Sequence, residues 1–393
     1  MWLVAAGKAA EGMAAGAAAT LGERLKGGVV VGVDLDHALP GNGLERLRGG
    51  HPVPNDDSQR AGVRALAVAG ATADDEQLLV LLSGGASALL AVPASGLTLA
   101  DKQQATTMLL REGAEIHRLN TVRKHLSAIK GGRLAAAAAG ASRTLLISDV
   151  VGDDPSVIAS GPTVADPSTF QDALNVLDQL GGRTAYPSSV VTRLARGATG
   201  GVPETPKPGD PRLNRAEATV IGGRGHAMEG AADEARRRGY HTIVLDLPVV
   251  GEARAAAVTH IRHLSAVAGS RRPVCVISSG ETTVRVTGGG RGGRNQEFAL
   301  AAATVRECFG AAAGSGWTLL ASVGTDGVDG PTDAAGALVD QTTLERAIHL
   351  GLPAPGEFLH NNDAYAFFAP LGDLIKTGPT GTNVGDLQVF LSV

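Results

Sequence analysis

Short apolar runs alternate with helix-like segments along most of the chain, and this alternation restricts the possible folds more than any other feature. The apolar runs cover residues 2–6, 29–33, 78–82, 144–148, 218–221, 242–245, 274–278, 284–286 and 319–323. Alternation of this kind favours mainly parallel or mixed sheets with helices on both faces. Glycine occupies 54 positions, about twice the usual share, as expected for many tight strand-to-helix turns. The sequence therefore predicts an α/β protein.

The chain is long enough for two such domains. Its 393 residues exceed the roughly 250–300 at which a single hydrophobic core stops growing. Residues 197–215 are dense in proline and glycine and show no hydrophobic periodicity, so they are the best candidate for a linker. We therefore expect an N-terminal domain over residues 1–205 and a C-terminal domain over residues 206–393.

The charge balance and the cysteines exclude several classes of function. The chain has 35 basic and 39 acidic residues, and no basic stripe with interleaved aromatic residues suggests nucleic-acid binding. Cys275 and Cys308 lie too far apart for a zinc or redox motif, which fits a reducing cytoplasm. Lys8 and Glu11 interrupt the Ala-rich start, so no signal peptide is predicted, and no apolar run reaches the ~18 residues of a membrane span. We expect a cytoplasmic protein without a membrane or nucleic-acid partner.

Loops that follow the strands are the expected place for chemistry, because ligands of open α/β sheets bind beyond the carboxyl ends of the strands. Lys8 follows the first predicted strand and opens an Ala-rich helix, where a positive charge attracts phosphate, unless Lys8 is a solvated surface residue. The loop after the third predicted strand contains Ser83, Gly84, Gly85 and Ser87, whose small side chains leave backbone N–H groups open to an anion. A tight turn is the alternative, and no Gly-Lys-Ser/Thr closes this loop as in Walker A.

A basic helical stretch and an acidic loop come next along the chain. Arg123, Ser127 and Lys130 recur at three- and four-residue spacing and so share one side of a helix. The strand that follows ends in a loop with Asp149 and Asp153, which can bind metal or orient a hydroxyl group. A solvated helix face and a simple Asp-Pro turn are the alternatives.

The second half carries the glycine-rich run GGGRGGRNQE directly before a helical pattern. Arg294, flanked by Gly293 and Asn295, is placed to present its guanidinium group to an anion together with free N–H groups. A flexible linker is the alternative. Glu281 follows a strand, and Asn362 lies in a further polar loop.

Three carboxylates, Asp326, Asp329 and Asp333, lie in one Gly-rich loop, TDGVDGPTD, after the apolar run WTLLASV. Such a loop suits a hydrated Mg²⁺ held by one or two acids beside substrate phosphates. An Asx-rich surface turn is the alternative. The predicted metal ligands along the whole chain are one or two of Asp149, Asp153, Asp326 and Asp329.

Two enzyme signatures are absent from the sequence. The closest match to a dinucleotide fingerprint, at residues 223–228, has Met228 where Gly or Ala is required, and no acidic residue is clearly placed about twenty positions later. No Gly-x-Ser-x-Gly nucleophile elbow occurs. The sequence therefore argues against a dehydrogenase.

Several blocks, in order and nearly from end to end of the chain, carry a family resemblance: GKAAEGM, GGHPVP, LLSGGASALL, NTVRKHLSAIKGGRLA, ISDVVGDDPSVIASGPTVADPSTF, GGRNQEFAL, SVGTDGVDGPTDAAGA and KTGPTGTNVGDLQVF. These blocks resemble the class II glycerate kinases, whose C-terminal half is called the MOFRL domain. The resemblance implies a Rossmann-like N-terminal domain and a MOFRL-type C-terminal domain, with the active site in the cleft between them. It also implies ATP-dependent phosphorylation of D-glycerate, usually to 2-phosphoglycerate, with Mg²⁺. D-glycerate and ATP are then the expected small-molecule partners of a monomer or homodimer.

The resemblance also implies roles for individual residues. Lys8 and Arg294 match basic residues used in catalysis and phosphate binding, and Asp149 and Asp326 match acids near the cleft; these four are the predicted catalytic residues. The residues predicted to bind the nucleotide are Ser83, Gly84, Gly85, Ser87, Lys130, Glu281, Gly293 and Asn295. The residues predicted to bind the substrate are Arg123, Ser127 and Asn362. Charge and helical spacing, rather than the resemblance, predict that Arg123 or Lys130 clamps the glycerate carboxylate.

Two other functions and one departure from the family pattern accompany this resemblance. Relatives in the family are also labelled hydroxypyruvate reductases, so NAD(P)H-dependent reduction of hydroxypyruvate is one alternative, against which the missing fingerprint argues. A non-catalytic sugar-acid or nucleotide binding protein is the other. Family members usually carry a helical segment before the first strand, whereas this chain begins almost on that strand, and we expect a shortened or misassigned start.

Overall fold

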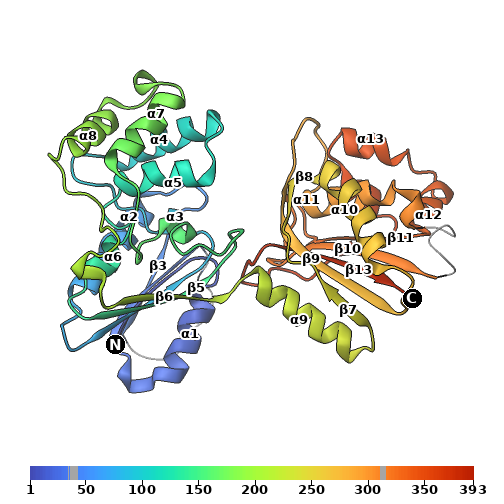
Figure 1. The fold of residues 1–393 in the computed structure, drawn as a ribbon, viewed down its shortest axis with the longest axis horizontal. Helices are drawn as coiled ribbons and strands as arrows, with labels where there is room; N and C mark the ends of the chain where they lie inside the picture. The colour runs from blue at the N-terminus through green and yellow to red at the C-terminus, as the bar shows by residue number, and fades with distance from the viewer. Residues whose placement is uncertain (34, 36–42, 310–315) are drawn as a thin grey trace. The chain divides into compact units, whose positions relative to one another are not determined.

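The computed structural model describes residues 1–33, 35, 43–309 and 316–393, and it divides into two compact units, Met1–Ile221 and Gly222–Val393 (Figure 1). The sequence analysis placed the boundary earlier, after residue 205. The difference arises because residues 216–222, expected in the second domain, form an outer strand of the first sheet. An apolar run indicates a strand but does not reveal which sheet the strand will join.

The first unit is built on a six-stranded sheet with the strand order β3-β2-β1-β4-β5-β6. The strands are β1 (Trp2–Ala6), β2 (Gly27–Gly32), β3 (Leu44–Arg48), β4 (Gln77–Leu82), β5 (Ala141–Ile147) and β6 (Ala216–Gly222). The pairs β1–β2, β1–β4, β2–β3 and β4–β5 are parallel. The central strands β1, β2 and β4 are apolar and buried along nearly their whole length, as a parallel sheet covered on both faces requires. The predicted α/β fold is confirmed.

Helices cover both faces of this sheet. The helices are α1 (Ala10–Leu21), α2 (Asp56–Gly70), α3 (Ala86–Leu89), α4 (Leu99–Arg111), α5 (Ile116–His125), α6 (Arg133–Ala136), α7 (Phe170–Gln179) and α8 (Ser188–Ala198), with the 3-10 turns η1 (Gly22–Arg24), η2 (Ile158–Ser160), η3 (Arg183–Ala185) and η4 (Pro211–Leu213). Helix α1 packs on one face through Ala10 and Ala14, and α2 packs on the other through Ala61 and Ala65. These two helices cover the strands β1 and β4 from opposite faces of the sheet.

Local sequence fixes where three of these helices begin. Asn55, Thr98 and Thr169 cap α2, α4 and α7, and each accepts a hydrogen bond from a backbone N–H in the first turn. In all three cases the side chain of the donor residue bonds back to the cap, which satisfies two N–H groups that a helix start leaves open. The starts of α4 and α7 are therefore set by local sequence.

Helices α4, α5, α7 and α8 gather into a helical layer with a hydrophobic core of its own (Figure 1). This core includes the fully buried side chains of Phe170, Leu109 and Val122. The layer carries α5, which contains Arg123 and precedes Lys130, two of the basic residues singled out in the sequence.

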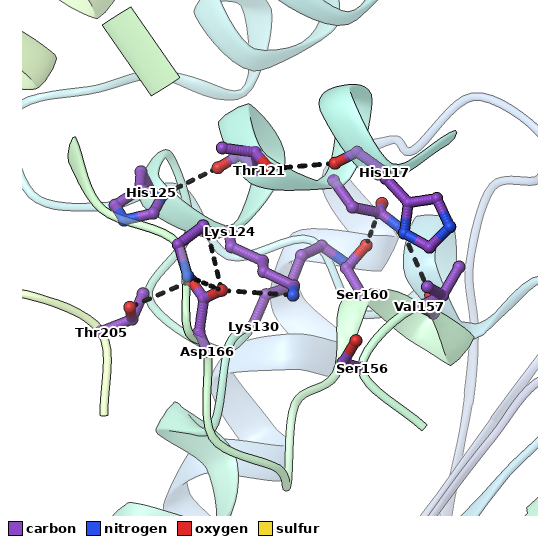
Figure 2. A network of polar contacts seen from close by, with 12 residues as sticks. His117, Thr121, Lys124, His125, Lys130, Ser156, Val157, Ser160, Asp166 and Thr205 are labelled. Carbon is purple, nitrogen blue, oxygen red and sulfur yellow. Dashed lines mark hydrogen bonds and ion pairs between the residues drawn. The ribbon is translucent and has the colours of Figure 1, made fainter. Parts of the chain in front are cut away.

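A buried ion pair connects this helical layer to the segments that follow it (Figure 2). The Nζ atom of Lys124 lies 3.3 Å from Oδ1 of Asp166, and their side chains are 8% and 0% exposed. The hydroxyl of Thr205 donates to the other oxygen of Asp166 at 3.0 Å. Burial alone would raise the pKa of Asp166, but the Lys124 ammonium and the Ser168 donors hold it below its ordinary value. Because Thr205 belongs to the predicted linker, part of that segment packs onto the first unit.

The second unit is built on a mixed sheet with the strand order β12-β11-β10-β13-β9-β7, to which β8 adds by pairing with β9. The strands are β7 (His241–Val244), β8 (Val249–Glu252), β9 (Val274–Thr283), β10 (Thr318–Gly324), β11 (Gly336–Asp340), β12 (Leu374–Ile375) and β13 (Asp386–Ser392). Strands β7 and β8 run parallel to β9, whereas β10–β11, β10–β13, β11–β12 and β13–β9 are antiparallel. The strand predicted over residues 284–286 does not form, because β9 extends through Thr283 and ends there.

Helices also cover both faces of the second sheet. They are α9 (Arg224–Arg237), α10 (Ala253–Ala268), α11 (Arg294–Ala303), α12 (Thr343–His349), α13 (Pro355–His360) and α14 (Ala364–Phe368), with the 3-10 turn η5 (Arg306–Cys308). Helices α10 and α11 share one core through Ile261 and Phe298, and α9 packs against Cys275 on the other face. Among the described helices, none is long and apolar enough to cross a membrane.

Replacing Asp166 with alanine is predicted to lower the free energy of unfolding by about 3–5 kcal/mol, because the Lys124 ammonium would remain buried without a partner. Urea unfolding followed by circular dichroism measures the loss. The double variant Asp166→Leu/Lys124→Met removes both charges and should recover most of the stability. Equal losses in the single and double variants would show that the ion pair is not what holds this region.

Candidate functional site

The strand order of the first sheet locates a candidate site at the carboxyl ends of β1 and β4. From β1 the chain proceeds outward to β2 and β3 and then returns to place β4 on the other side of β1, so the loops after β1 and β4 leave in opposite directions. The loops of Lys8 and Ser83 meet there: the Lys8 N–H donates to the Gly84 carbonyl at 2.9 Å, and the Ala9 N–H donates to Ser83 Oγ at 3.0 Å. Two loops predicted separately from the sequence are thus brought together.

Two glycines allow this approach. Gly7 has a φ of +126°, and a Cβ at this position would lie 2.2 Å from Ser83 Oγ. A Cβ on Gly84 would lie 2.2 Å from Oδ2 of Asp149. Any side chain at either position would push the loops apart. The sequence therefore uses glycine where backbone and functional side chains must be in contact.

An acid and a histidine border the same loops. Asp149, predicted as a catalytic acid and metal ligand, follows β5 and places its carboxylate against Gly84. The His51 ring packs against Gly85, where an added Cβ would lie 3.1 Å from Cδ2 of the histidine. Burial and the positive charge of Lys8 lower the pKa of His51. The sequence analysis did not single out His51, because a histidine in a loop before a helix carries no signal until the fold places it beside Lys8.

Asp153, the second predicted acid of the β5 loop, has a left-handed backbone with a φ of +52°. Its Oδ1 is buried and makes no hydrogen bond with any described residue. An unpartnered buried carboxylate oxygen is costly and suits a bound cation. Nowhere in residues 1–33, 35, 43–309 and 316–393 do three or more His, Cys, Asp or Glu residues gather as a metal cluster. One or two acids are all that a substrate-bound Mg²⁺ needs.

The far end of the Ser83–Ser87 loop contacts Lys130. The Lys130 ammonium donates to Oγ of Ser87 at 2.9 Å and to its carbonyl at 2.7 Å. Ser87 Oγ lies 2.9 Å from Ser160 Oγ, and Ser160 in turn donates to Asn120 Oδ1 at 2.9 Å. Figure 2 shows Lys130 and Ser160 in the middle of the polar network around α5. Ser87 and Lys130, both predicted as site residues, are therefore in direct contact.

Arg123, Ser127 and Lys130, predicted to share one side of a helix, differ in their surroundings. Ser127 is fully buried and donates to the Val92 carbonyl at 3.1 Å, so it shapes the loop after α5 rather than facing a ligand. Arg123 is half-buried and forms no hydrogen bond or ion pair within the described part of the chain. Lys102 of α4, which the sequence analysis did not select, shares this region, and burial together with the charge of Arg123 lowers the pKa of Lys102 to about 7.

In the second unit, Arg294 is held by two carboxylates. Its guanidinium donates to Glu281 Oε1 at 2.8 Å and to Asp386 Oδ1 at 2.9 Å, and Nε lies 2.7 Å from Asp386 Oδ2. The strand register places Asp386 opposite Gly280 and Gly324, so the two acids approach from neighbouring strand ends. Despite burial, these carboxylates hold the pKa of Arg294 above its ordinary value. The positive charge predicted to face a phosphate is thus compensated by acids, one of which, Asp386, was not predicted.

Asp329 occupies the helix start that the sequence analysis assigned to an anion. It accepts hydrogen bonds from the backbone N–H groups of Asn295 at 3.0 Å and Gln296 at 2.8 Å, at the N-terminus of α11. A Cβ on Gly293 would lie 2.3 Å from the Asp329 carboxyl carbon, so glycine is required for this contact. The carboxylate therefore serves as the cap of α11, and its geometry does not support the predicted metal-binding role. The reason is that the anion attracted by the helix start comes from the protein itself.

The remaining predicted residues of the second unit are dispersed in two loops. Asn362 is buried with a φ of +53°; its oxygen accepts from the N–H groups of Thr287 and Gly288, and its amide donates to Glu297 Oε2. The side chain of Asn362 therefore makes its hydrogen bonds within the protein, where it stabilises a loop. Asp326 accepts from the Val328 N–H at 3.2 Å at the turn after β10.

Comparison with known proteins was made on sequence and on structure. The model of a domain of unknown function, DUF4147, matches residues 1–195, and the model of the MOFRL family matches residues 274–386. A D-glycerate 2-kinase of Thermotoga maritima is 39% identical over 400 residues, which cover 100% of this chain and 90% of that protein. An Agrobacterium vitis protein with the provisional name hydroxypyruvate reductase is 40% identical, covering 99% of this chain and 86% of that one. The crystal structure of a Thermotoga maritima glycerate kinase superposes with a TM-score of 0.88 at 39% identity, covering 100% of this chain and 91% of that chain.

Replacing Asp329 with alanine is predicted to destabilise the second unit by about 1–2 kcal/mol, because α11 loses its cap. Thermal unfolding of the variant measures this effect. Asp333→Ala in the same loop is the matched control, since Asp333 is exposed and pairs with Lys376 at the surface, where water screens an ion pair. Equal losses from the two variants would contradict the capping role.

The same carboxyl predicts a pH dependence. Burial raises the pKa of Asp329 to about 6, although the Asn295 and Gln296 N–H groups oppose this, so the folded protein holds this proton more tightly than the unfolded chain. The resulting stabilisation is fully present below the unfolded pKa and is lost as the pH rises through about 6. The cost of Asp329→Ala should therefore be larger at about pH 4 than at about pH 7. Urea unfolding of the wild type and of Asp329→Ala across this pH range tests the prediction. A difference in the free energy of unfolding that does not change with pH would contradict it.

Proposed function

This chain belongs to the glycerate kinase family that carries the MOFRL domain, and from that membership we propose that it transfers the γ-phosphoryl group of ATP to D-glycerate, giving 2-phosphoglycerate. The observation that carries the proposal is the meeting of Lys8, Asp149 and the Ser83–Ser87 loop at the carboxyl ends of β1 and β4. Phosphoryl transfer depends mainly on positioning and on neutralising the charge of the transferred group, and this meeting point offers both.

The hydroxy acid is proposed to bind along the Ser83–Ser87 loop. Its carboxylate would contact Arg123 and Lys130 at the Ser87 end, because a guanidinium without a partner and a buried ammonium favour a carboxylate. Its 2-hydroxyl would then lie at the Gly84 end, where the Asp149 carboxylate can accept the hydroxyl proton as oxygen attacks phosphorus. The short loop thus orients the acceptor with one charged contact at each end.

Charge on the transferred phosphoryl group would be neutralised from several directions. Lys8 lies at the β1 end, where its N–H donates to the Gly84 carbonyl, and it would supply a positive charge there. Mg²⁺, when bound, would be held by Asp153, whose buried oxygen lacks a partner in the described chain, and would neutralise phosphate charge.

A steady-state assay with D-glycerate, ATP and Mg²⁺ tests this function. Coupling through enolase alone reports 2-phosphoglycerate, and coupling through phosphoglycerate mutase plus enolase also reports 3-phosphoglycerate. We expect signal with enolase alone. Signal that requires the mutase would make the protein a 3-kinase, and binding of ATP and glycerate without turnover would make it a binding protein. Oxidation of NADH or NADPH with hydroxypyruvate, in place of phosphorylation, would establish a reductase.

Two substitutions should separate binding from catalysis. Arg123→Ala is expected to raise the KM for D-glycerate about 10-fold or more with a smaller change in kcat, because a charged hydrogen bond to the ground-state carboxylate is lost. Lys8→Ala should lower kcat by about 100-fold, because its charge acts on the transferred group. The control is Arg118→Ala on the same helix α5, since Arg118 bonds to Gln179 at the surface. An unchanged KM in Arg123→Ala would refute the clamp.

A further inference from the structure

Three basic side chains of the first unit share a buried region without an acidic partner. Lys102 of α4 is 7% exposed, and its ammonium donates to the Val92 carbonyl at 3.2 Å. Lys130 is 3% exposed and donates to oxygen atoms of Ser87 and Ala159. Neither ammonium forms an ion pair with a carboxylate in the described ranges, and Arg123 has no hydrogen bond or ion pair there. The region therefore collects positive charge.

This arrangement costs stability in the ligand-free protein. Moving an ammonium group out of water is costly unless an opposite charge compensates it, and like charges nearby add to that cost. Burial and the charges of Arg123 and Lys102 lower the pKa of Lys130 well below its usual value. Lys124 on α5 is also buried, but its ammonium is paired with the Asp166 carboxylate. One buried lysine of this region thus has an acidic partner within the chain, whereas Lys102 and Lys130 donate to neutral oxygen atoms, so an anionic ligand would compensate their charge.

Contacts through the Val92 carbonyl place Lys102 beside the loop after α5. The same oxygen accepts from Lys102 Nζ at 3.2 Å and from Ser127 Oγ at 3.1 Å, and Ser127 Oγ in turn accepts from the Lys130 N–H at 3.4 Å. Helix α4 is thereby joined to the turn that carries Lys130. The Lys102 ammonium is therefore buried at the Val92 carbonyl, next to the turn that carries Lys130, and is not solvated at the surface.

The size of the Ser83–Ser87 loop relates this region to the reacting groups. Gly84 contacts the Asp149 carboxylate, and Ser87, three residues later, contacts the Lys130 ammonium. Three residues span at most about 11 Å when extended, and less where a helical turn begins, as at Ala86. An acid and a buried cation separated by so short a loop are close enough for one small hydroxy acid, with a hydrogen bond at each side, to contact both.

We propose that Lys102 is a third member of the carboxylate subsite, and that Lys102, Arg123 and Lys130 together hold the carboxylate of the 2-hydroxy acid substrate. The inference rests on the proposed function and adds to it a residue on a different helix, α4. An ammonium has three donors, and only one of those of Lys102 is used by Val92, which leaves donors for a carboxylate. Lys130 uses its three donors on Ser87 and Ala159, so it would exchange the longest of these bonds, the 3.4 Å bond to the Ala159 carbonyl, for the carboxylate. Lys102 is thus a specificity-determining residue for the anionic end of the substrate.

The test compares Lys102→Met with wild type in two measurements on the full-length protein. Isothermal titration with D-glycerate, D-lactate and inorganic phosphate, in the absence of nucleotide, reports anion binding without turnover. Thermal unfolding of the ligand-free proteins reports the stability cost of the charge. Lys102→Arg, which keeps the charge, is the rescue variant, and Lys124→Met is the matched control, because it removes a buried lysine that already has an acidic partner.

We expect Lys102→Met to weaken D-glycerate and D-lactate binding about 10-fold or more while the ligand-free melting temperature stays the same or rises. Lys102→Arg should restore most of the affinity, and Lys124→Met should instead lower the melting temperature. Unchanged carboxylate affinity in Lys102→Met would overturn the inference, as would a loss confined to phosphate binding. Failure of the proposed function would give a different result. The wild type would then bind the hydroxy acids but show no phosphoryl transfer with ATP and Mg²⁺.

Discussion

The site of the first unit depends on one topological constraint, the reversal of strand order between β1 and β4. In a parallel sheet covered on both faces, this reversal is where two loops diverge and leave backbone open at the carboxyl edge. Here the two loops bond to each other through Lys8 and Gly84, and glycines at positions 7 and 84 let Ser83 and Asp149 make contact with the backbone. The acids, the basic residues and the helical layer are arranged around that edge.

The buried charges divide into those that hold the fold and those left for a ligand. Lys124 is neutralised by Asp166, and Arg294 by Glu281 and Asp386, so their charges are compensated within the described chain. Lys102 and Lys130 are as deeply buried as Lys124, yet each donates only to neutral oxygen atoms. Because an uncompensated buried charge is costly, its retention points to binding rather than to packing. The distinction requires burial and partners, which residue type alone does not provide.

Sequence reasoning predicted the α/β fold and the loops at β1 and β4, because apolar alternation and Gly-rich turns are local signals. It assigned β6 to the second domain, since the choice of sheet is a matter of tertiary pairing. It read Asp329 as a metal ligand because the sequence shows the carboxylate but not the start of α11 against which it folds. Lys102 was overlooked for the same reason: its burial depends on how α4 packs beside α5. Which groups contact substrate among the predicted residues stays a prediction.

The most direct test of the central claim is a crystal structure of the protein with D-glycerate and a non-hydrolysable ATP analogue. We expect the glycerate carboxylate within hydrogen-bond distance of Arg123, Lys130 and Lys102, and its 2-hydroxyl beside Asp149 at the Gly84 end of the loop. Glycerate bound with its carboxylate away from these three cations, or away from the carboxyl ends of β1 and β4, would contradict the account.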